Sequence, residues 1–344
     1  MAEEIKDFTL GELEGRFQKL GIERYRAAQV FGWLYAKGVD DFSLMTDLPA
    51  ALRERLAASF VVGPMAVEKV QTAADGVRKF LFRLKDGCRV EGVAIPHEGR
   101  WTACLSTQVG CRFGCAFCAS GASGFKRNLS AAEIVGQLLT VRRHLPEGHV
   151  SHVVFMGVGE PLDNYDNLLR SVRILNEEKG LRLGVRKMTV STCGLAAGIT
   201  RLAGEGLELE LSVSLHAATD KKRSEILPVN RIDPLKRLLP AVKTYIEATG
   251  RKVTFEYVLL GSYSTTVEDA RDLVRLVRGM NVKINLIPYN DAQARGGFQP
   301  PTKMEALFFK SYLSKHGIDV TLRRPRGGDI RAACGQLRAQ ATKQ

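Results

Sequence analysis

From about residue 100 to residue 322, short apolar runs alternate with longer amphipathic segments, and this pattern constrains the fold most. The apolar runs have the length and composition of buried strands, and they are Ala103–Ser106, Val153–Met156, Met188–Ser191, Leu209–Leu215, Val253–Leu259, Val282–Ile287 and Ile318–Leu322. Helix-length segments, several opened by a capping residue, include Ser130–His144, Asn164–Lys179, Pro234–Ala248, Thr266–Arg278 and Thr302–His316. This alternation predicts an α/β fold with a parallel sheet, either doubly wound or an incomplete (β/α) barrel. In both architectures the site lies at the carboxyl ends of the strands.

The chain before the first of these strands has a different pattern. Residues 10–60 are helical in character, since Leu13 and Phe17 would share one helix face. Residues 67–95 show strand-like alternation, and Asp86-Gly87 offers a hairpin turn. We therefore expect a small accessory domain of helices and a short β hairpin. The predicted domains are residues 1–95 and residues 96–344.

Three cysteines in one short segment, Cys111, Cys115 and Cys118, form a CxxxCxxC run directly after the first strand of the alternating region. A tight loop can direct three thiolates at one iron–sulfur cluster and leave one iron without a protein ligand. That iron can chelate the amino and carboxylate groups of S-adenosylmethionine. A zinc site is the alternative, with Cys104 as a lone fourth ligand. The third possibility is that these three cysteines bind neither a metal ion nor a cluster.

Charge and composition narrow the class of protein. The chain has 50 Lys and Arg against 37 Asp and Glu, a net charge of +13, which favours a polyanionic partner such as nucleic acid. An odd total of seven cysteines argues against a disulfide framework. No run approaches the roughly 20 apolar residues of a membrane span, and we expect a cytosolic protein. The basic residues cluster at Arg142-Arg143, Lys221-Lys222-Arg223 and Arg323-Arg324-Pro325-Arg326.

Five ordered motifs carry a resemblance to a known family, and they run from Gln108 through Leu129, from Met156 to Leu162, from Ser214 to His216, from Asn285 to Asn290 and from Ala332 to Leu337. In these motifs the sequence resembles the RlmN/Cfr family of radical S-adenosylmethionine enzymes, which methylate adenosine in RNA. The resemblance implies a partial (β/α)6 radical-SAM barrel, with a 4Fe–4S cluster on Cys111, Cys115 and Cys118. It also implies one S-adenosylmethionine that donates a methyl group and a second that yields a 5′-deoxyadenosyl radical.

The family's reactive residues match three further positions. Cys334 matches the cysteine that is methylated and then loses hydrogen to the radical, so that its methylene carbon adds to the base. Cys104 matches the second cysteine, which resolves the adduct and leaves a disulfide with the first. Glu91 matches the proposed proton acceptor. Cys88 and Cys193 match no family function, and we expect them to be buried apolar residues.

Polar residues that follow successive strands match the family's contacts to S-adenosylmethionine. They form one ring at the mouth of the expected barrel, and they are Gly159, Glu160, Ser191, Ser214, Leu215, His216 and Asn290. The Gly159-Glu160 pair is no dinucleotide fingerprint, which would need a third glycine at the start of a helix, because Pro161 follows at once.

Two branches of the family methylate different carbons of adenine. Pro161 in the Gly-Glu-Pro-Leu string is typical of the C2 branch, since the C8 branch usually has alanine there. The C2 branch acts on an adenosine of 23S rRNA at the peptidyl-transferase centre and on the adenosine beside the anticodon of some tRNAs. Arg331 departs from the pattern, because an acidic residue is usual at that position, and we interpret it as a phosphate contact.

Three hypotheses remain at this point. The first is a C2 methyltransferase, expected to be a monomer that takes its electron from a separate flavodoxin or ferredoxin. The second is a C8 methyltransferase or another radical enzyme of the same superfamily. The third is a zinc-stabilised RNA-binding protein without catalysis.

Overall fold

The structure is a computed structural model that describes residues 2–122, 124–145, 149–291 and 296–337. Its helices are α1 (Leu10–Lys19), α2 (Tyr25–Phe31), α3 (Ala50–Ser59), α4 (Ala119–Ala122), α5 (Ala131–His144), α6 (Tyr165–Asn176), α7 (Ala196–Ala203), α8 (Asp220–Ile226), α9 (Leu235–Thr249), α10 (Val267–Val277) and α11 (Lys303–Lys315). Its strands are β1 (Glu3–Glu4), β2 (Phe60–Val61), β3 (Ala66–Thr72), β4 (Arg78–Arg83), β5 (Arg89–His97), β6 (Arg100–Cys104), β7 (Gln108–Gly110), β8 (Phe125–Asn128), β9 (His149–Phe155), β10 (Met188–Thr192), β11 (Glu210–Ser214), β12 (Val253–Leu259), β13 (Val282–Pro288) and β14 (Asp319–Leu322).

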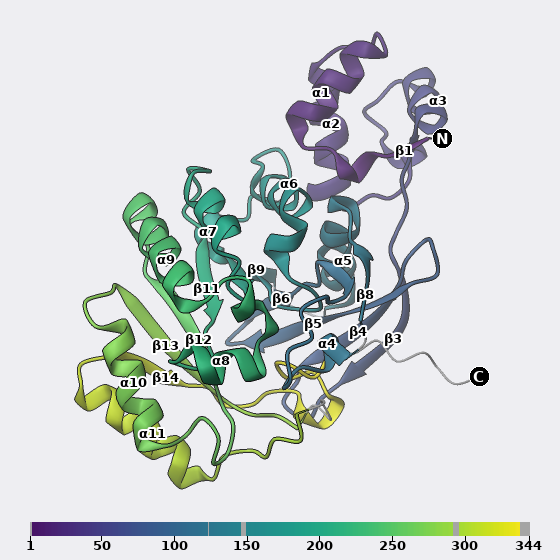
Figure 1. Ribbon diagram of the computed structural model, residues 1–344. Helices are drawn as coiled ribbons and strands as arrows, with labels where there is room; N and C mark the ends of the chain where they lie inside the picture. The colour runs from purple at the N-terminus through teal and green to yellow at the C-terminus, as the bar shows by residue number, and fades with distance from the viewer. Residues whose placement is uncertain (1, 123, 146–148, 292–295, 338–344) are drawn as a thin grey trace.

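A ten-stranded sheet organises the molecule, in the order β14-β13-β12-β11-β10-β9-β6-β5-β4-β3. From β6 to β14 the strands follow chain order and are all parallel. A strand order without reversal is that of a barrel rather than of a doubly wound sheet. The sheet stays open, since β14 and β3 are its two edges, and Figure 1 shows helices α5, α6, α7 and α9 along its outer side. The predicted partial barrel is confirmed.

The alternation along each strand separates a helix-covered face from a concave face. In β10, Met188 and Val190 are fully buried in the core, whereas Thr189 and Ser191 are only half-buried. Strand pairing carries this alternation across the sheet, because paired residues point to the same side. Ser214 pairs with Glu256, which in turn pairs with Asn285. The concave face is therefore polar, and the core lies between the other face and the helices.

The predicted accessory region consists of helices α1, α2 and α3 followed by strands β3 to β5. The helices form their own group in Figure 1, and an ion pair between Glu12 and Arg170 links α1 to α6. The strands extend the large sheet, since β5 pairs with β6 in antiparallel register, Val93 opposite Cys104. The ten-stranded sheet thus continues across the expected boundary at residue 95.

The segment after β14 turns back toward the accessory strands. The backbone N–H of Gly327 donates to Asp75 in the β3–β4 turn at 3.1 Å. Further along, the carbonyl of Gly335 accepts a bond from the N–H of Ala119 at 2.7 Å. Figure 1 shows this yellow segment beside α4. It brings residues 327–337 to the carboxyl ends of the barrel strands.

No helix in the described part of the chain is both long and apolar enough to cross a membrane.

Candidate active site

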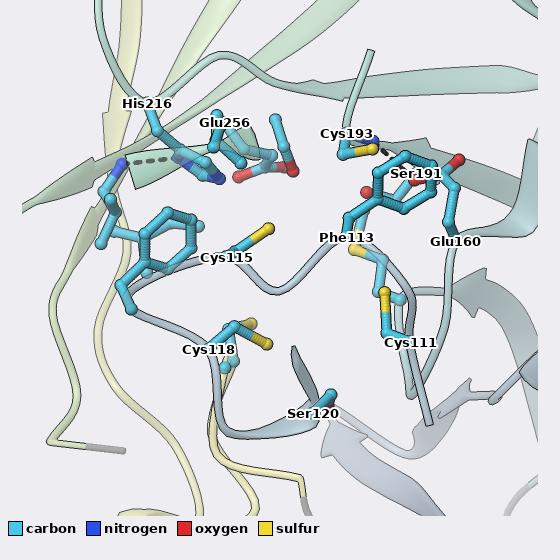
Figure 2. A pocket seen from close by; sticks show the side chains of 18 of the residues that line it. Cys111, Phe113, Cys115, Cys118, Ser120, Glu160, Ser191, Cys193, His216 and Glu256 are labelled. Carbon is cyan, nitrogen blue, oxygen red and sulfur yellow. Dashed lines mark hydrogen bonds between the residues drawn. The ribbon is translucent and has the colours of Figure 1, made fainter. Parts of the chain in front are cut away.

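One cavity opens at the carboxyl ends of the parallel strands, and Figure 2 shows many of its side chains. Residues from the cysteine loop, the strand ends and the C-terminal segment line it together. The predicted site residues among them are Cys111, Cys115, Cys118, Gly159, Glu160, Ser191, Ser214, His216, Asn290 and Cys334. The structure therefore gathers at one place residues that lie more than 200 positions apart in the sequence.

The loop that carries the three expected cluster ligands is held by main-chain hydrogen bonds. A small two-stranded sheet, β7 with β8, precedes and follows it, which the sequence did not predict. The N–H of Cys111 donates to the carbonyl of Gly124 at 3.0 Å, and the N–H of Ala116 donates to the carbonyl of Ile226 at 3.0 Å. These bonds fix the backbone of the loop, so that its side chains are presented to the cavity.

The three sulfur atoms border a common space in Figure 2. In the described ranges, no three His, Cys, Asp or Glu side chains are grouped so that they could hold a single metal ion. Burial raises the pKa of Cys111 to about 12 and that of Cys115 well above its usual value, and the neighbouring thiols contribute. A bound iron cluster would favour the thiolate forms. Three thiols around one space fit such a cluster.

Glu160 is 3% exposed and lies within the 156–162 motif, after strand β9. Its carboxylate accepts hydrogen bonds from the N–H groups of Leu162 at 3.0 Å and Cys193 at 2.7 Å. Burial raises the pKa of Glu160, although these bonds oppose the rise. The N–H of Glu160 donates to the side chain of Gln108 at 2.9 Å, which ties this motif to strand β7.

Gly159 is required by its surroundings. Its φ is +107°, and a Cβ placed there would lie 2.6 Å from the Cβ of Gln108 and 2.9 Å from the backbone nitrogen of the same residue. A side chain would therefore be both strained and obstructed. The close approach of the two backbones lets the N–H of Glu160 reach the side chain of Gln108.

His216 has a fixed orientation and a fixed charge. Its Nδ1 accepts a hydrogen bond from the N–H of Val258 at 3.0 Å, and Phe117 of the cysteine loop packs edge-on against its ring at 4.7 Å between centroids. Burial lowers the pKa of His216 to about 3, with a contribution from Arg223, so the ring is neutral at neutral pH. Leu215 was also predicted to contact S-adenosylmethionine, but its side chain lies in the core at 0% exposure.

The two remaining cysteines of interest occupy different environments. Cys334 is exposed and lines the cavity. Cys104 is 8% exposed and packs in a small cluster with Val158 and Ala332. Burial raises the pKa of Cys104 to about 12, and interaction with Cys334 adds to the rise. Cys104 is thus buried beside the segment that carries Cys334, whose own thiol is open to the cavity.

Glu91 lies on the same side of the sheet as Cys104. Val93 pairs with Cys104, and Glu91 is two residues before Val93, which places both on the concave face. Glu91 is 5% exposed and forms an ion pair with Lys79 at 3.2 Å. The carboxylate predicted as proton acceptor is therefore buried rather than solvated.

Several residues at the cavity were not predicted as site residues. Cys193 is buried as expected, but it lines the cavity and binds Glu160 through its N–H. Glu256 and Arg323 also line the cavity, and Asn285 donates to the Glu256 carboxylate at 2.8 Å. Strand register could have indicated Glu256, since it pairs with Ser214. Cys88, expected to be buried, is only partly buried.

One arginine from each of two basic clusters, Arg223 and Arg323, points into the protein rather than to the outer surface. Arg223 has 0% exposure, and its guanidinium donates to the carbonyls of Leu215 and Cys193 and to the side chain of Asn230. It therefore holds the ends of β10 and β11 together. Arg323 faces the cavity and interacts electrostatically with Cys334. Arg223 is too deeply buried to contact a polyanion, whereas Arg323 is directed into the cavity.

Two family models match this chain. One describes the ribosomal RNA large subunit methyltransferase N-terminal domain and covers residues 3–62. The other describes the radical SAM superfamily and covers residues 105–277. The second range includes the cysteine loop and the predicted ring of polar strand ends up to His216.

Similar proteins extend the match over almost the whole chain. A probable dual-specificity RNA methyltransferase RlmN of Geobacillus thermodenitrificans is 45% identical over 342 residues, 99% of this chain and 94% of the relative. The protein of the same description from Symbiobacterium thermophilum is also 45% identical, over 99% of this chain and 92% of the relative. A crystal structure of a radical SAM methyltransferase from Sphaerobacter thermophilus superposes with a TM-score of 0.93 at 42% identity, covering 98% of this chain and 100% of that one.

Proposed function

The chain belongs to the RlmN family of radical S-adenosylmethionine enzymes, and from this premise we propose that it methylates C2 of adenosine in RNA. The observation that carries the proposal is that Cys334 lines the same cavity as Cys111, Cys115 and Cys118. A methyl group on Cys334 would thus lie in the compartment where the radical forms. The proposed substrates are an adenosine of 23S rRNA and the adenosine beside the anticodon of tRNA.

The cofactors follow from the family, which implies a 4Fe–4S cluster and S-adenosylmethionine. Cys111, Cys115 and Cys118 would hold the cluster. When bound, the cluster supplies the electron that cleaves S-adenosylmethionine to a carbon radical. The electron would come from a separate flavodoxin or ferredoxin. The enzyme itself would be a monomer in the cytoplasm.

The strand ends would bind S-adenosylmethionine. Glu160 would attract the methionyl ammonium group, which the peptide of Gly159 can also approach. Ser191, Ser214 and Asn290 line the same cavity and offer hydroxyl and amide groups to the rest of the molecule. Neutral His216 would contact the adenosyl part without placing a second positive charge near the sulfonium.

Cys334, Glu91 and Cys104 would act in successive steps of the reaction. Cys334 would take a methyl group from one S-adenosylmethionine through its sulfur, and that methyl group would then lose a hydrogen atom to the 5′-deoxyadenosyl radical of a second. The methylene radical would bond to C2 of adenine, and the adduct would lose one electron to the oxidised one-electron carrier and its C2 proton to Glu91. Cys104 would attack the sulfur of Cys334, so that a disulfide forms, the carbon–sulfur bond breaks and the released carbon takes up a proton to become the methyl group. The packing of Cys104 with Ala332, two positions before Cys334, supports this order of events.

The choice of C2 over C8 rests on Pro161. It opens a 3-10 turn over residues 161–164 that begins directly after Glu160. Alanine at this position would lack the fixed backbone angle of proline. The turn therefore sets the direction in which the Glu160 carboxylate enters the cavity.

The mechanism is tested by replacing Cys104 with alanine in the full chain with its cluster reconstituted. Without a second thiol, the RNA should stay bonded to Cys334, and a denaturing gel should show a covalent protein–RNA species after a single turnover. Release of free methylated RNA at the wild-type rate would overturn the assignment of Cys104. Replacement of Cys88 by alanine is the matched control, because Cys88 lies on the β4–β5 connection and is only partly buried.

A further inference from the structure

The lysine that pairs with Glu91 has a second contact, and that contact leads to the loop of Cys334. The Nζ atom of Lys79 lies 3.2 Å from the Glu91 carboxylate. The same Nζ donates to the backbone carbonyl of Arg331 at 3.3 Å. The Lys79 side chain is only 11% exposed, so this ammonium group is largely withdrawn from water. One buried charge therefore links a carboxylate on β5 to the C-terminal segment.

Strand register explains why Lys79 can reach both partners. Lys79 pairs with Val93 across β4 and β5, and Val93 pairs with Cys104 across β5 and β6. The side chains of Lys79, Glu91 and Cys104 consequently share the concave face. The accessory strands thus continue the concave face of the sheet beyond β6, while the residues that line the cavity itself come from other elements.

The β3–β4 turn holds the same loop at two more points. The carboxylate of Asp75 accepts from the N–H of Gly327 at 3.1 Å, and the N–H of Ala74 donates to the carboxylate of Asp329 at 3.0 Å. The Nη1 group of Arg326 reaches the carbonyl of Pro96 at 2.5 Å. These contacts join chain positions about 250 apart, and they hold the segment that leads to Cys334.

The loop needs such support because one of its residues other than glycine, Arg331, adopts a left-handed backbone conformation. Gly327 has a φ of +63°, and a Cβ there would lie 2.9 Å from the side chain of Val77. Arg331 adopts a φ of +53°, an unfavourable conformation for a residue with a Cβ. The carbonyl that Lys79 holds belongs to this residue, three positions before Cys334.

We propose that Lys79 is a positioning residue for methyl transfer, which through one ammonium group holds the Glu91 carboxylate and the Cys334 loop in a fixed mutual arrangement. The inference rests on the proposed function for the roles of Glu91 and Cys334. Proton removal from the adduct requires the carboxylate to reach C2 while the base is bonded to Cys334 through the methylene carbon. Lys79 sets that distance from both sides.

The test compares Lys79→Met, Lys79→Arg and wild type as full-chain, cluster-loaded enzymes. Methionine keeps an unbranched apolar stem and removes the charge, whereas arginine keeps the charge. Lys252→Met is the matched control, because Lys252 pairs with Asp319 at 2.8 Å at the amino ends of the strands. Three measurements are made: methylation of Cys334 by intact mass, the covalent adduct in a single turnover, and hydrogen exchange of residues 327–337 without substrate.

We expect Lys79→Met to retain methylation of Cys334 but to accumulate about tenfold more adduct than wild type. Deuterium at C2 should slow the decay of that adduct further, because proton removal then limits the rate. Hydrogen exchange of residues 327–337 should accelerate. Arginine should restore adduct decay to within about threefold of wild type, and Lys252→Met should behave as wild type in all three measurements.

Wild-type adduct levels together with wild-type exchange in Lys79→Met would overturn the inference. Faster exchange without excess adduct would also overturn it, since Lys79 would then only stabilise the loop. Absence of Cys334 methylation in the wild-type enzyme would contradict the proposed function instead. In that case, unchanged hydrogen exchange in Lys79→Met would still contradict the role of Lys79 in holding the Cys334 loop.

Discussion

The carboxylate of Glu160 accepts a hydrogen bond from the N–H of Cys193 at 2.7 Å, which joins the loops after β9 and β10 at the wall of the cavity. The other carboxylate oxygen accepts from the N–H of Leu162 at 3.0 Å. Each oxygen of the Glu160 carboxylate therefore accepts one backbone hydrogen bond. The site fits only a side chain that has two acceptor atoms in these positions.

Replacement of Glu160 by glutamine should weaken binding of S-adenosylmethionine about tenfold or more. Glutamine would place an NH2 group against one of two backbone N–H donors, and an unsatisfied buried donor costs roughly 1–3 kcal/mol. The charge that faces the methionyl ammonium would also be lost. Equilibrium dialysis measures the dissociation constant, and iron content should stay at the wild-type level. Glu208→Gln is the control, since Glu208 is in a surface ion pair with Arg186; equal affinity of Glu160→Gln and wild type would contradict the assignment.

Replacement of Gly159 by alanine should destabilise the fold by about 1–3 kcal/mol, because the methyl group would meet Gln108 in a strained backbone conformation. Thermal unfolding measures this loss. Gly184→Ala provides the comparison, because a Cβ there meets nothing within 4 Å. If both variants unfolded at the same temperature, the close approach of residues 159 and 108 would be disproved.

The stability of the protein should depend on His216 below about pH 6.5, the usual pKa of histidine. The folded state lowers the pKa of His216 to about 3, so between these values the unfolded chain binds a proton that the folded chain does not. Stability contributed by His216 is therefore complete above pH 6.5 and is lost as the pH falls toward 3. His216→Asn keeps an acceptor for Val258 and tolerates the φ of +59°.

Melting temperatures at pH 5 and pH 7.5 test this point. The wild type should lose more stability on acidification than His216→Asn does. The comparison is needed because Glu160 and Glu256, whose pKa values burial raises, act in the opposite direction. Parallel losses in both proteins would show that His216 is not buried in its neutral form.

Resolution of the adduct should accelerate with pH. Burial is the main cause that raises the pKa of Cys104, to about 12, and it persists in the adduct, so the thiolate fraction grows about tenfold per pH unit between pH 7 and 9. Adduct formed in a single turnover and then shifted to each pH should decay up to about tenfold faster per unit. A decay rate that does not vary over this range would exclude Cys104 as the attacking thiol.

The sequence predicted the barrel well because its information is local. Each parallel strand of the large sheet has an apolar run of its own, and helices such as α5 and α11 begin at capping boxes visible in the sequence, Ser130 with Glu133 and Thr302 with Glu305. The cysteine loop was found for the same reason, since its three ligands lie within eight residues. Short helices α7 and α8 were not predicted, because their apolar faces are only two turns long.

Contacts made between distant segments could not be predicted from such patterns. Lys79 is one of many alternating residues in its strand, and its pairing with Glu91 depends on the antiparallel register of β4 and β5. Its contact with Arg331 depends further on a segment that returns over 252 positions. Arg223 looked like surface charge because its neighbours in sequence are lysines, although its five-donor group binds carbonyls in the interior.

The central claim, a radical methylation at C2 of adenosine, is tested most directly by the identity of the modified nucleoside. The cluster-loaded enzyme is supplied with S-adenosylmethionine, a one-electron donor and RNA that contains the substrate adenosine, and the digested product is analysed by mass spectrometry against both methyladenosine standards. The account predicts 2-methyladenosine, which disappears when Cys118 or Cys334 is replaced by alanine. Formation of 8-methyladenosine, or 2-methyladenosine that persists without Cys118, would contradict it.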